Sequence, residues 1–379
     1  MRSEQLCWMP PSGWQTARPG ELGDEAQLVL VFGGTEQLHD PQPIAALRRA
    51  YPRARLFGCS TAGEICGDRV TDGTLIATAI HFAHTQIDIA CVGVSAIDDS
   101  FRAGAQLGRA LVQPDLTHVL VLSDGITING SALIEGLASS LPPGVTITGG
   151  LSGDGERFGQ TLVLADGAPA PGLVAGLGLY GKRLKVGFGS LGGWDPFGPE
   201  RLITRSSGNV LYELDGRSAL TLYKKYLGEH AAELPAAGLL FPLSLRTRTG
   251  ETGLVRTVLS VDEEAQSMTF AGDMPQGAYA RLMMANFDRL IDGAIGAART
   301  SYHAIGDTSP DLAILISCVG RKLLLKQRVE EEIEGVRDVL GPHTPITGFY
   351  SYGEISPFTP GANCELHNQT MTITTLAEE

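Results

Sequence analysis

The hydrophobic positions of the chain form short apolar runs that recur in the same order three times. Each copy begins with a mainly apolar run typical of a buried strand, at residues 26–34, 118–125 and 311–318. A stretch with apolar residues at helical spacing follows, at residues 43–51, 131–141 and 323–341. A second apolar run and a glycine-rich loop close each copy, at residues 54–65, 144–155 and 345–355. The pattern predicts a repeated strand–helix–strand unit.

Further strands are expected after each loop. Residues 73–95 and 172–193 each read as two strands, and residues 368–376 read as the last strand of the chain. Sheets with helices on an outer face bury such runs best. We therefore predict an α/β fold of repeated strand–helix–strand units with glycine-rich loops, in which mixed sheets covered by helices form two lobes.

The segment between the second and third copies has a different pattern. Residues 194–209 are rich in turn-forming residues and predict a loop, and residues 210–235 predict a strand, a turn and an amphipathic helix. Short strands and a long helix at 276–300 are expected after them. The composition changes near residues 205–216, which predicts three parts: an N-terminal extension at 1–26, a first domain at 27–215 and a second at 216–379.

Composition and charge narrow the function classes. The chain has 379 residues, 43% of them hydrophobic, and a formal net charge of −13, which disfavours a general nucleic-acid or anionic-membrane surface. No apolar stretch reaches the roughly 18 residues of a membrane span, and the start lacks the pattern of a signal peptide. The six cysteines form no CxxC pair. These features favour a cytoplasmic protein with free thiols.

Two of the glycine-rich loops are close copies of each other. LFGCSTAGEI (56–65) and ITGFYSYGEI (346–355) both place a glycine five residues before a Gly-Glu-Ile triplet. Glycine lets a ligand approach the backbone closely, and such loops expose N–H groups beyond the ends of strands. We expect the two loops to converge on one site, whose predicted ligand-binding residues are Gly58, Ser60, Thr61, Gly63, Glu64, Gly348, Ser351, Tyr352, Gly353 and Glu354. The two glutamates could instead satisfy N–H groups of their own loops.

Four motifs in order carry a family resemblance. The segments GCSTAGEI (58–65), SCVGR (317–321), GFYSYGEI (348–355) and LHNQT (366–370) resemble the FIST domain, whose two parts would cover nearly the whole chain. The resemblance implies a sensory module that binds a small ligand and signals to a partner, and it does not imply an enzyme. Stand-alone members of similar length include nitric-oxide-sensing haem proteins that regulate a histidine kinase and cyclic-di-GMP signalling. For this chain the resemblance therefore implies haem b and a gas ligand.

A haem needs an axial ligand and partners for its propionates. His230 follows an aromatic helical face that includes Tyr226, and we expect it to be the ligand of the haem iron. His367 is the second choice, and a thiolate from Cys59 or Cys318 is a third. An ordinary histidine at the flank of a helix would have the same pattern.

Two further residues lie in the family motifs. Arg321 is expected at a strand end, where its guanidinium suits a carboxylate or a haem propionate, although an ion pair with an acid of 330–334 would also explain it. Asn368 is a candidate for ligand contact or for a structural hydrogen bond.

Other functions remain open. A sensor of an amino acid or another small metabolite is the alternative within the same class, and a pure interaction scaffold is another. A serine hydrolase would need Ser351, His367 and Glu354 to form a triad, but neither loop matches G-x-S-x-G.

Overall fold

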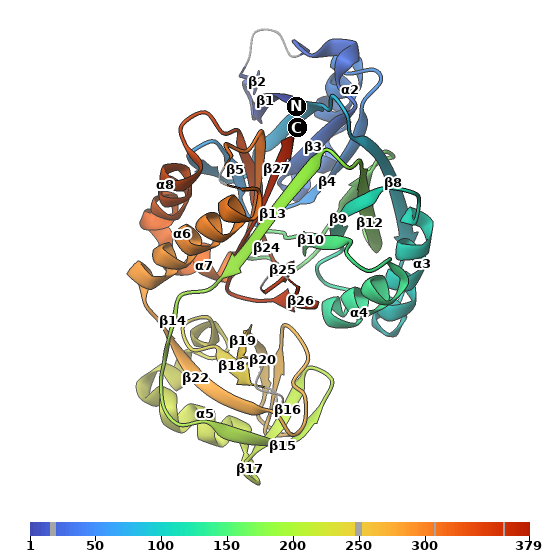
Figure 1. The fold of residues 1–379 in the computed structure, drawn as a ribbon. Coiled ribbons are helices and arrows are strands. Elements are labelled where there is room, and N and C mark those ends of the chain that lie inside the picture. The colour runs from blue at the N-terminus through green and yellow to red at the C-terminus, as the bar shows by residue number, and fades with distance from the viewer. Residues whose placement is uncertain (16–19, 247–251, 307, 359–360) are drawn as a thin grey trace.

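The computed structural model of the chain describes residues 1–15, 20–246, 252–306, 308–358 and 361–379. It is an α/β fold with three six-stranded mixed sheets in a core and a further strand-rich lobe (Figure 1). The fold class predicted from the hydrophobic pattern is confirmed. Within the described residues, no helix is both long and apolar enough to cross a membrane.

The first sheet contains the first copy of the repeat. Its strand order is β11-β4-β3-β7-β1-β2, and β3 and β4 are parallel. The strands are β1 (Arg2–Met9), β2 (Gly13–Trp14), β3 (Leu28–Gly33), β4 (Arg55–Ser60), β7 (Leu75–His81) and β11 (Val163–Ala165). The helices are α1 (Thr35–His39) and α2 (Pro41–Ala50). Part of the expected N-terminal extension is thus a strand of this sheet, because β1 pairs with β7 from Arg2 to Trp8; residues 16–19 of it lie outside the described part.

The second sheet has the order β26-β25-β10-β9-β12-β8. Its strands are β8 (Gln86–Gly93), β9 (Leu116–Ser123), β10 (Thr146–Leu151), β12 (Leu173–Tyr180), β25 (Gly353–Pro357) and β26 (Cys364–His367). The helices α3 (Ser100–Leu111) and α4 (Gly130–Ser140) pack on one another beside this sheet, where small residues such as Gly104 and Gly136 bring the two backbones close (Figure 1).

The third sheet has the order β13-β27-β23-β24-β5-β6. Its strands are β5 (Glu64–Cys66), β6 (Arg69–Thr71), β13 (Leu184–Leu191), β23 (Leu312–Cys318), β24 (Ile346–Ser351) and β27 (Met371–Glu378). The covering helices are α6 (Phe287–Ala304), α7 (Val319–Leu325) and α8 (Val329–Leu340). The expected single helix over 323–341 is divided, because Lys326 adopts a φ of 51° between α7 and α8.

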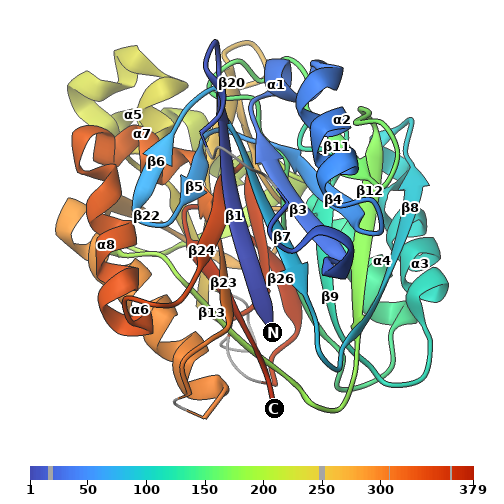
Figure 2. The same ribbon diagram turned by 90° about the horizontal axis from the view of Figure 1, so that it is seen from above.

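The three sheets share one plan. In each, a parallel pair is followed by two antiparallel strands, in the orders β4-β3-β7-β1, β10-β9-β12-β8 and β24-β23-β27-β13. Alternate residues of a strand point to opposite sides of a sheet, so each sheet has an inner and an outer face. The inner faces of the three sheets meet in a common core. This core contains Leu28 and Leu30, Leu120 and Leu122, and Ile314 and Ile316, one pair from each sheet. The three units are therefore arranged around a pseudo-threefold axis (Figure 2).

Each unit also lends a strand to a neighbouring unit. The loop after β4 forms β5, which pairs with β24 of the third sheet. The loop after β24 forms β25, which pairs with β10 of the second sheet, and the loop after β10 leads to β11, which pairs with β4 of the first. The exchange is cyclic, so each sheet is complete only when all three units are present.

The strand-rich lobe is inserted between β13 and α6 (Figure 1). It has its own hydrophobic core, around Leu211, Tyr223 and Phe270. Its helix is α5 (Ala219–Leu227), and its strands are β14 (Trp194–Pro196), β15 (Arg201–Ser207), β16 (Val210–Leu214), β17 (Arg217–Ser218), β18 (Leu243–Arg246), β19 (Thr252–Arg256), β20 (Val258–Asp262), β21 (Ser267–Phe270) and β22 (Tyr279–Ala285).

The lobe departs from the sequence expectations in two places. The expected loop at 194–209 contains β14 and β15, and the expected long helix at 276–300 is β22 followed by α6. The boundary expected at residues 215/216 lies in the turn between β16 and β17 of the lobe. The helical period in the sequence continues through Asn286, but in the structure the side chain of Asn286 accepts from Arg289 N and so caps the start of α6.

Candidate functional site

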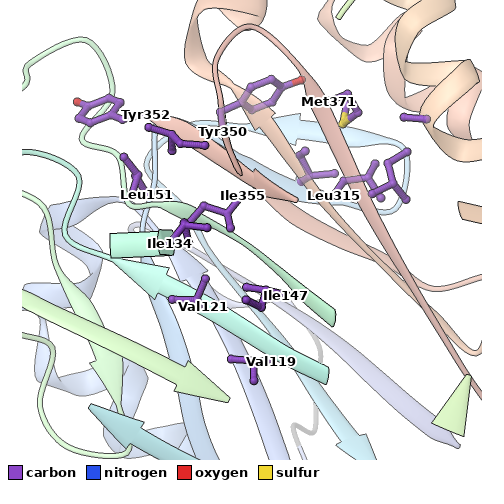
Figure 3. Close-up of a cluster of buried hydrophobic side chains, with 14 of the residues drawn as sticks. Val119, Val121, Ile134, Ile147, Leu151, Leu315, Tyr350, Tyr352, Ile355 and Met371 are labelled. Carbon is purple, nitrogen blue, oxygen red and sulfur yellow. The ribbon is translucent and has the colours of Figure 1, made fainter. Parts of the chain in front are cut away.

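The three glycine-rich loops meet where the sheets join. Main-chain hydrogen bonds link them in a ring: Ala62 N to Tyr350 O (2.8 Å), Tyr352 N to Leu151 O (3.2 Å) and Gly153 N to Ser60 O (2.9 Å). Each bond runs from one unit to the next. Figure 3 shows Leu151 close to Ile355 and Tyr352 in this region, although these residues come from different units. The two Gly-Glu-Ile loops thus lie side by side, as predicted, while their role as a ligand site stays a prediction.

Glu64 is buried inside its own loop. Its carboxylate accepts from the hydroxyl of Thr61, and from both N–H (3.0 Å) and hydroxyl (2.7 Å) of Thr74, at the start of the next strand. Burial raises the pKa of Glu64 to about 7, and the hydrogen bonds oppose that rise. The carboxylate thus ties the loop to β7.

Glu354 repeats this arrangement in the third unit. It accepts from the hydroxyl of Ser351 (2.6 Å) and from the N–H (3.1 Å) and hydroxyl (2.9 Å) of Thr370. Burial raises its pKa to about 8. The geometry corresponds to the alternative in which the glutamates satisfy groups of their own loops. The prediction that they contact a ligand needs correction, because both carboxylates are enclosed by protein donors.

In the second unit a different acidic residue accepts hydrogen bonds from the residue that precedes the next strand. Asp124, which follows β9, accepts from Gly172 N (3.1 Å) and from the hydroxyl of Thr161 (3.0 Å). Gly172 precedes β12 as Thr74 precedes β7 and Thr370 precedes β27. The loss of Gly-Glu-Ile from this copy is therefore compensated by an aspartate from another strand end.

The glycines of the repeated loops serve close packing of strands. A Cβ on Gly58 would lie 1.7 Å from Val31 O, and one on Gly348 would lie 1.9 Å from Leu315 O, on the neighbouring parallel strand. Gly149 has the same relation to Val121 O. Three further predicted residues, Ser60, Gly63 and Gly353, are also enclosed at this junction, where Ser60 donates to Gly153 O, Gly63 lies against Lys322, and Gly353 lies against Leu151 and Leu366.

Tyr352 is the predicted loop residue that reaches a cavity. Its hydroxyl accepts from Asp154 N (3.0 Å), and its ring stacks on Phe158 at 4.3 Å. The cavity measures about 200 Å³ and lies between the core and the inserted lobe. Its walls include Asn129, Leu151, Phe158 and Tyr352 from the core, and Phe270 and Asp273 from the lobe.

A larger cavity of about 470 Å³ adjoins the first. It lies between α4 and the β26 segment on one side and the lobe on the other, and Asp273 lines both cavities. Its walls include Ser131, Glu135, Ala138, Arg256, Asp273 and Leu366. A volume of this size is in the range of sites for small molecules.

A hydrogen bond between core and lobe lies where the cavities meet. Asn129 Nδ2 donates to Asp273 Oδ1 (3.1 Å), while Asn129 Oδ1 accepts from Ala132 N and caps α4. Asn129, Asp273 and Arg256 were missed in the sequence, because they lie in no repeated motif. The available signal was weak: an asparagine before a helical stretch.

Arg321 does not have the role expected of it. It is wholly buried in α7, where its Nη2 donates to Glu332 (2.7 Å) and to Leu290 O (2.6 Å), and its Nη1 donates to Gly192 O (2.8 Å). Glu332 belongs to the acidic run 330–334, so the ion-pair alternative describes the geometry. A guanidinium enclosed in this way cannot bind a propionate without breaking the pair.

The expected haem residues also lie apart from the cavities. His230 is exposed in a 3₁₀ helix after α5, and its Nδ1 lies 3.9 Å from Glu233. Tyr226 makes a contact near the surface, since its hydroxyl accepts from Arg201 (2.6 Å). The hollow beside Tyr226 is only about 20 Å³, so it cannot hold a porphyrin. The prediction of His230 as iron ligand in an apolar pocket needs correction for this reason.

His367 and its neighbours are enclosed. His367 Nε2 bonds to Ser356 O (2.8 Å), and burial lowers its pKa to about 4. Asn368 is buried, and its side-chain amide has no hydrogen-bond partner among the described residues. No hydrolase triad forms from the residues considered, because Ser351 donates to Glu354 and His367 bonds elsewhere.

The alternative thiolate ligands are buried as well. Cys59 and Cys318 are almost inaccessible, and burial raises the pKa of both thiols. Protonated thiols of this kind are poor metal ligands. None of the haem residues expected from the sequence thus fits a haem in this structure.

Comparison with known proteins agrees with the motifs. A model of the FIST N domain matches residues 27–217, and a model of the FIST C domain matches residues 219–357. The chain belongs to the FIST family. FIST domains are sensory domains that bind small ligands in signalling.

Its relatives match over most of the length of the chain. An uncharacterized protein of Mycobacterium tuberculosis (strain CDC 1551) is 26% identical over 364 residues, covering 90% of this chain and 89% of the relative. An uncharacterized protein of Mycobacterium bovis is 24% identical over 378 residues, covering 95% and 93%. Among solved structures, a cyanuric acid hydrolase from A. caulinodans has 11% identity and a TM-score of 0.19, covering 78% of this chain and 99% of the hydrolase. That similarity is too low to support an argument.

Proposed function

We propose that this FIST protein is a sensor of a small metabolite, which binds in the cavities between the α/β core and the inserted lobe. The observation that supports this proposal is the pair of adjoining cavities, of about 200 and 470 Å³, whose walls come from both parts. Ligand sites occur preferentially at such interfaces between domains.

The site can convert binding into movement. A ligand that contacts both walls stabilises one position of the lobe relative to the core, and it shifts the equilibrium by its difference in affinity for the two positions. In this proposal a signalling partner, such as the histidine kinase implied by the family resemblance, reads the position of the lobe.

A cavity-filling variant tests the proposal. Ala138 lies on α4 at the wall of the larger cavity and is exposed, so the larger side chain of Ala138→Phe occupies part of the cavity without entering the protein core. We expect ligands found by native mass spectrometry of the wild-type protein to be lost from the variant. The control is Gly93→Ala, on the exposed edge strand β8, which adds a methyl group where there is open space and should retain the ligands. Equal binding by both variants would contradict the proposal.

A haem-based nitric-oxide sensor linked to cyclic-di-GMP signalling is the more specific alternative that the family resemblance implies. It needs a pocket at a histidine. Of the two expected ligands, His230 is exposed at the surface and His367 is enclosed by protein. An absorption spectrum after reconstitution with haem b tests it directly. A Soret band that moves on addition of nitric oxide would favour the haem sensor over the metabolite sensor.

A further inference from the structure

The larger cavity contains an unusual guanidinium. Arg256 ends β19, and only 4% of its surface is exposed. Its Nε donates to Asp273 O (3.1 Å), and its Nη1 donates to Leu366 O (2.9 Å) and Val255 O (3.3 Å). These acceptors are neutral carbonyls. No carboxylate oxygen of the described residues comes within 4.0 Å of this guanidinium, in contrast to Arg321 with Glu332.

A buried charge without a counter-ion is costly, so its presence requires an explanation. Burial lowers the pKa of Arg256 to about 10, even though the nearby charges of Glu365 and Asp273 act in the opposite direction. The side chain remains protonated at neutral pH. It therefore offers a charged, planar donor group at the wall of a cavity.

A glycine, Gly272, lies against the guanidinium of Arg256. A Cβ on Gly272 would lie 2.8 Å from Arg256 Nε and 2.9 Å from Cζ, so glycine allows the guanidinium to lie flat against the chain. Any larger residue at position 272 would push the guanidinium away from its carbonyl partners.

A second donor lies on the opposite wall. Ser131 is in the first turn of α4, and its buried hydroxyl has no hydrogen-bond partner among the described residues. The eleven-residue helix α4 also directs the positive end of its dipole towards this turn. A guanidinium, a hydroxyl and a helix N-terminus on one cavity complement an anion.

We propose that Arg256 is the anion-binding residue of the sensory site and that the ligand is a small carboxylate. The inference rests on the proposed function and assigns the chemical class of its ligand. Glu135 and Glu365 line the same cavity, so a second anionic group on the ligand would be repelled, and the other end of the ligand should carry hydrogen-bond donors.

The position of Arg256 also connects recognition to signalling. Its carbonyl partners come from the lobe (Asp273 and Val255) and from the core (Leu366). A carboxylate that binds the same guanidinium competes with the hydrogen bond from Arg256 to Leu366 O, and so weakens or strengthens the contact between lobe and core. Binding and lobe position are therefore coupled through one side chain.

Matched pairs of acids and amides test this assignment. The shift of the thermal unfolding midpoint is measured for the full chain with acetate, lactate and 4-aminobutyrate, each beside its carboxamide. We expect at least one acid to raise the midpoint while its amide does not, because the amide lacks the charge. Amides that act as well as acids, or acids without any effect, would overturn the proposal.

Two variants locate the effect. Arg256→Lys keeps a charge but removes the bidentate fork and should weaken binding of the active acid by about tenfold. Ser131→Ala should weaken it less and avoids the risk that a change at a buried arginine prevents folding. Arg246→Lys, at a half-buried arginine of the same lobe that pairs with Glu200, is the matched control and should bind as the wild type does. Unchanged affinity in both Arg256→Lys and Ser131→Ala would exclude this site.

Failure of this inference can be told from failure of the proposed function. Binding of neutral or cationic molecules that Ala138→Phe abolishes and Arg256→Lys leaves unchanged would retain the sensor and reject the carboxylate. Binding that Ala138→Phe does not affect would reject the cavity itself.

Discussion

At the scale of single residues, the most informative groups are the buried acids of the two Gly-Glu-Ile loops. Glu64 and Glu354 have the same set of partners, a hydroxyl within the loop and a threonine before the next strand. Their pKa values are raised to about 7 and about 8 by burial. Each glutamate therefore takes up a proton in the folded protein at a pH where the unfolded chain has lost it.

The first prediction follows from the sign of this shift. Because the folded pKa exceeds the unfolded one, the contribution of these two carboxyl groups to the free energy of unfolding should fall as pH rises from about 4.5 to about 8. Buried His367, with its lowered pKa, contributes with the opposite sign below about pH 6.5. In Glu354→Gln the contribution of Glu354 is lost. The slope of the free energy of unfolding against pH should then be less negative by up to about 1.4 kcal/mol per pH unit, the value for one proton. Denaturant unfolding at several pH values measures this.

The exposed Glu229 provides a control for that experiment. Glu229→Gln removes a carboxylate at the surface of the lobe and should leave the slope unchanged. A slope in Glu354→Gln equal to that of the wild type would show that Glu354 is ionised in the folded protein throughout this range.

A second prediction concerns Arg321. Arg321→Met leaves Glu332 as an uncompensated buried charge, so the free energy of unfolding should fall by about 3–5 kcal/mol. The double variant Arg321→Met/Glu332→Gln should recover part of this loss, because the remaining charge is gone. Urea unfolding of both proteins checks the pair, and a loss below about 1 kcal/mol in the single variant would argue against a structural role.

At the scale of elements, strand exchange makes the three units depend on one another. β5, β25 and β11 each complete the sheet of a different unit. The strands can approach because Gly58, Gly149 and Gly348 place no Cβ against the neighbouring carbonyl.

The third prediction tests this close approach. Gly348→Ala would place a methyl group 1.9 Å from Leu315 O, so the backbone must shift, and we expect a loss of about 1–3 kcal/mol in the free energy of unfolding. Gly93→Ala, in a strand with open space around it, should be neutral within about 0.5 kcal/mol. Similar effects of the two changes would mean that Gly348 is not required by packing.

At the scale of the whole molecule, the inserted lobe is held to the core across the two cavities. The Asn129–Asp273 hydrogen bond and the bond from Arg256 Nη1 to Leu366 O link the two parts there. Away from the cavities, Trp194 of the lobe donates to Gln369 O and packs against Leu290 of the core.

The fourth prediction is that Asp273→Ala loosens the lobe without unfolding the core. The substitution removes the acceptor of Asn129 Nδ2 but leaves the cap of α4 intact. Hydrogen exchange should quicken in segments 125–130 and 256–275, while the core strands β9 and β23 keep their protection. Asp262→Ala, at the exposed end of β20 in the same lobe, should not change exchange in segment 125–130. Uniform quickening over the whole chain would indicate global destabilisation instead.

The sequence alone determined the repeated units and their loops. Strands buried on both faces must be apolar throughout, so β3, β9 and β23 are visible as runs in the sequence. The glycines of the loops mark close approach of backbones, and this need is local enough to be seen as a motif. Helix boundaries were less visible, because α6 begins at a cap that interrupts no apolar pattern.

Only the tertiary structure decided where the site lies. Ser131, Arg256 and Leu366 are far apart in the chain and belong to no shared motif, so nothing local brings them to one cavity. Arg321 and Arg256 are both arginines close to strand ends, yet folding pairs the first with Glu332 and leaves the second beside neutral carbonyls. The cause is physical: the cost of burying a charge depends on its surroundings, and long-range packing sets those surroundings.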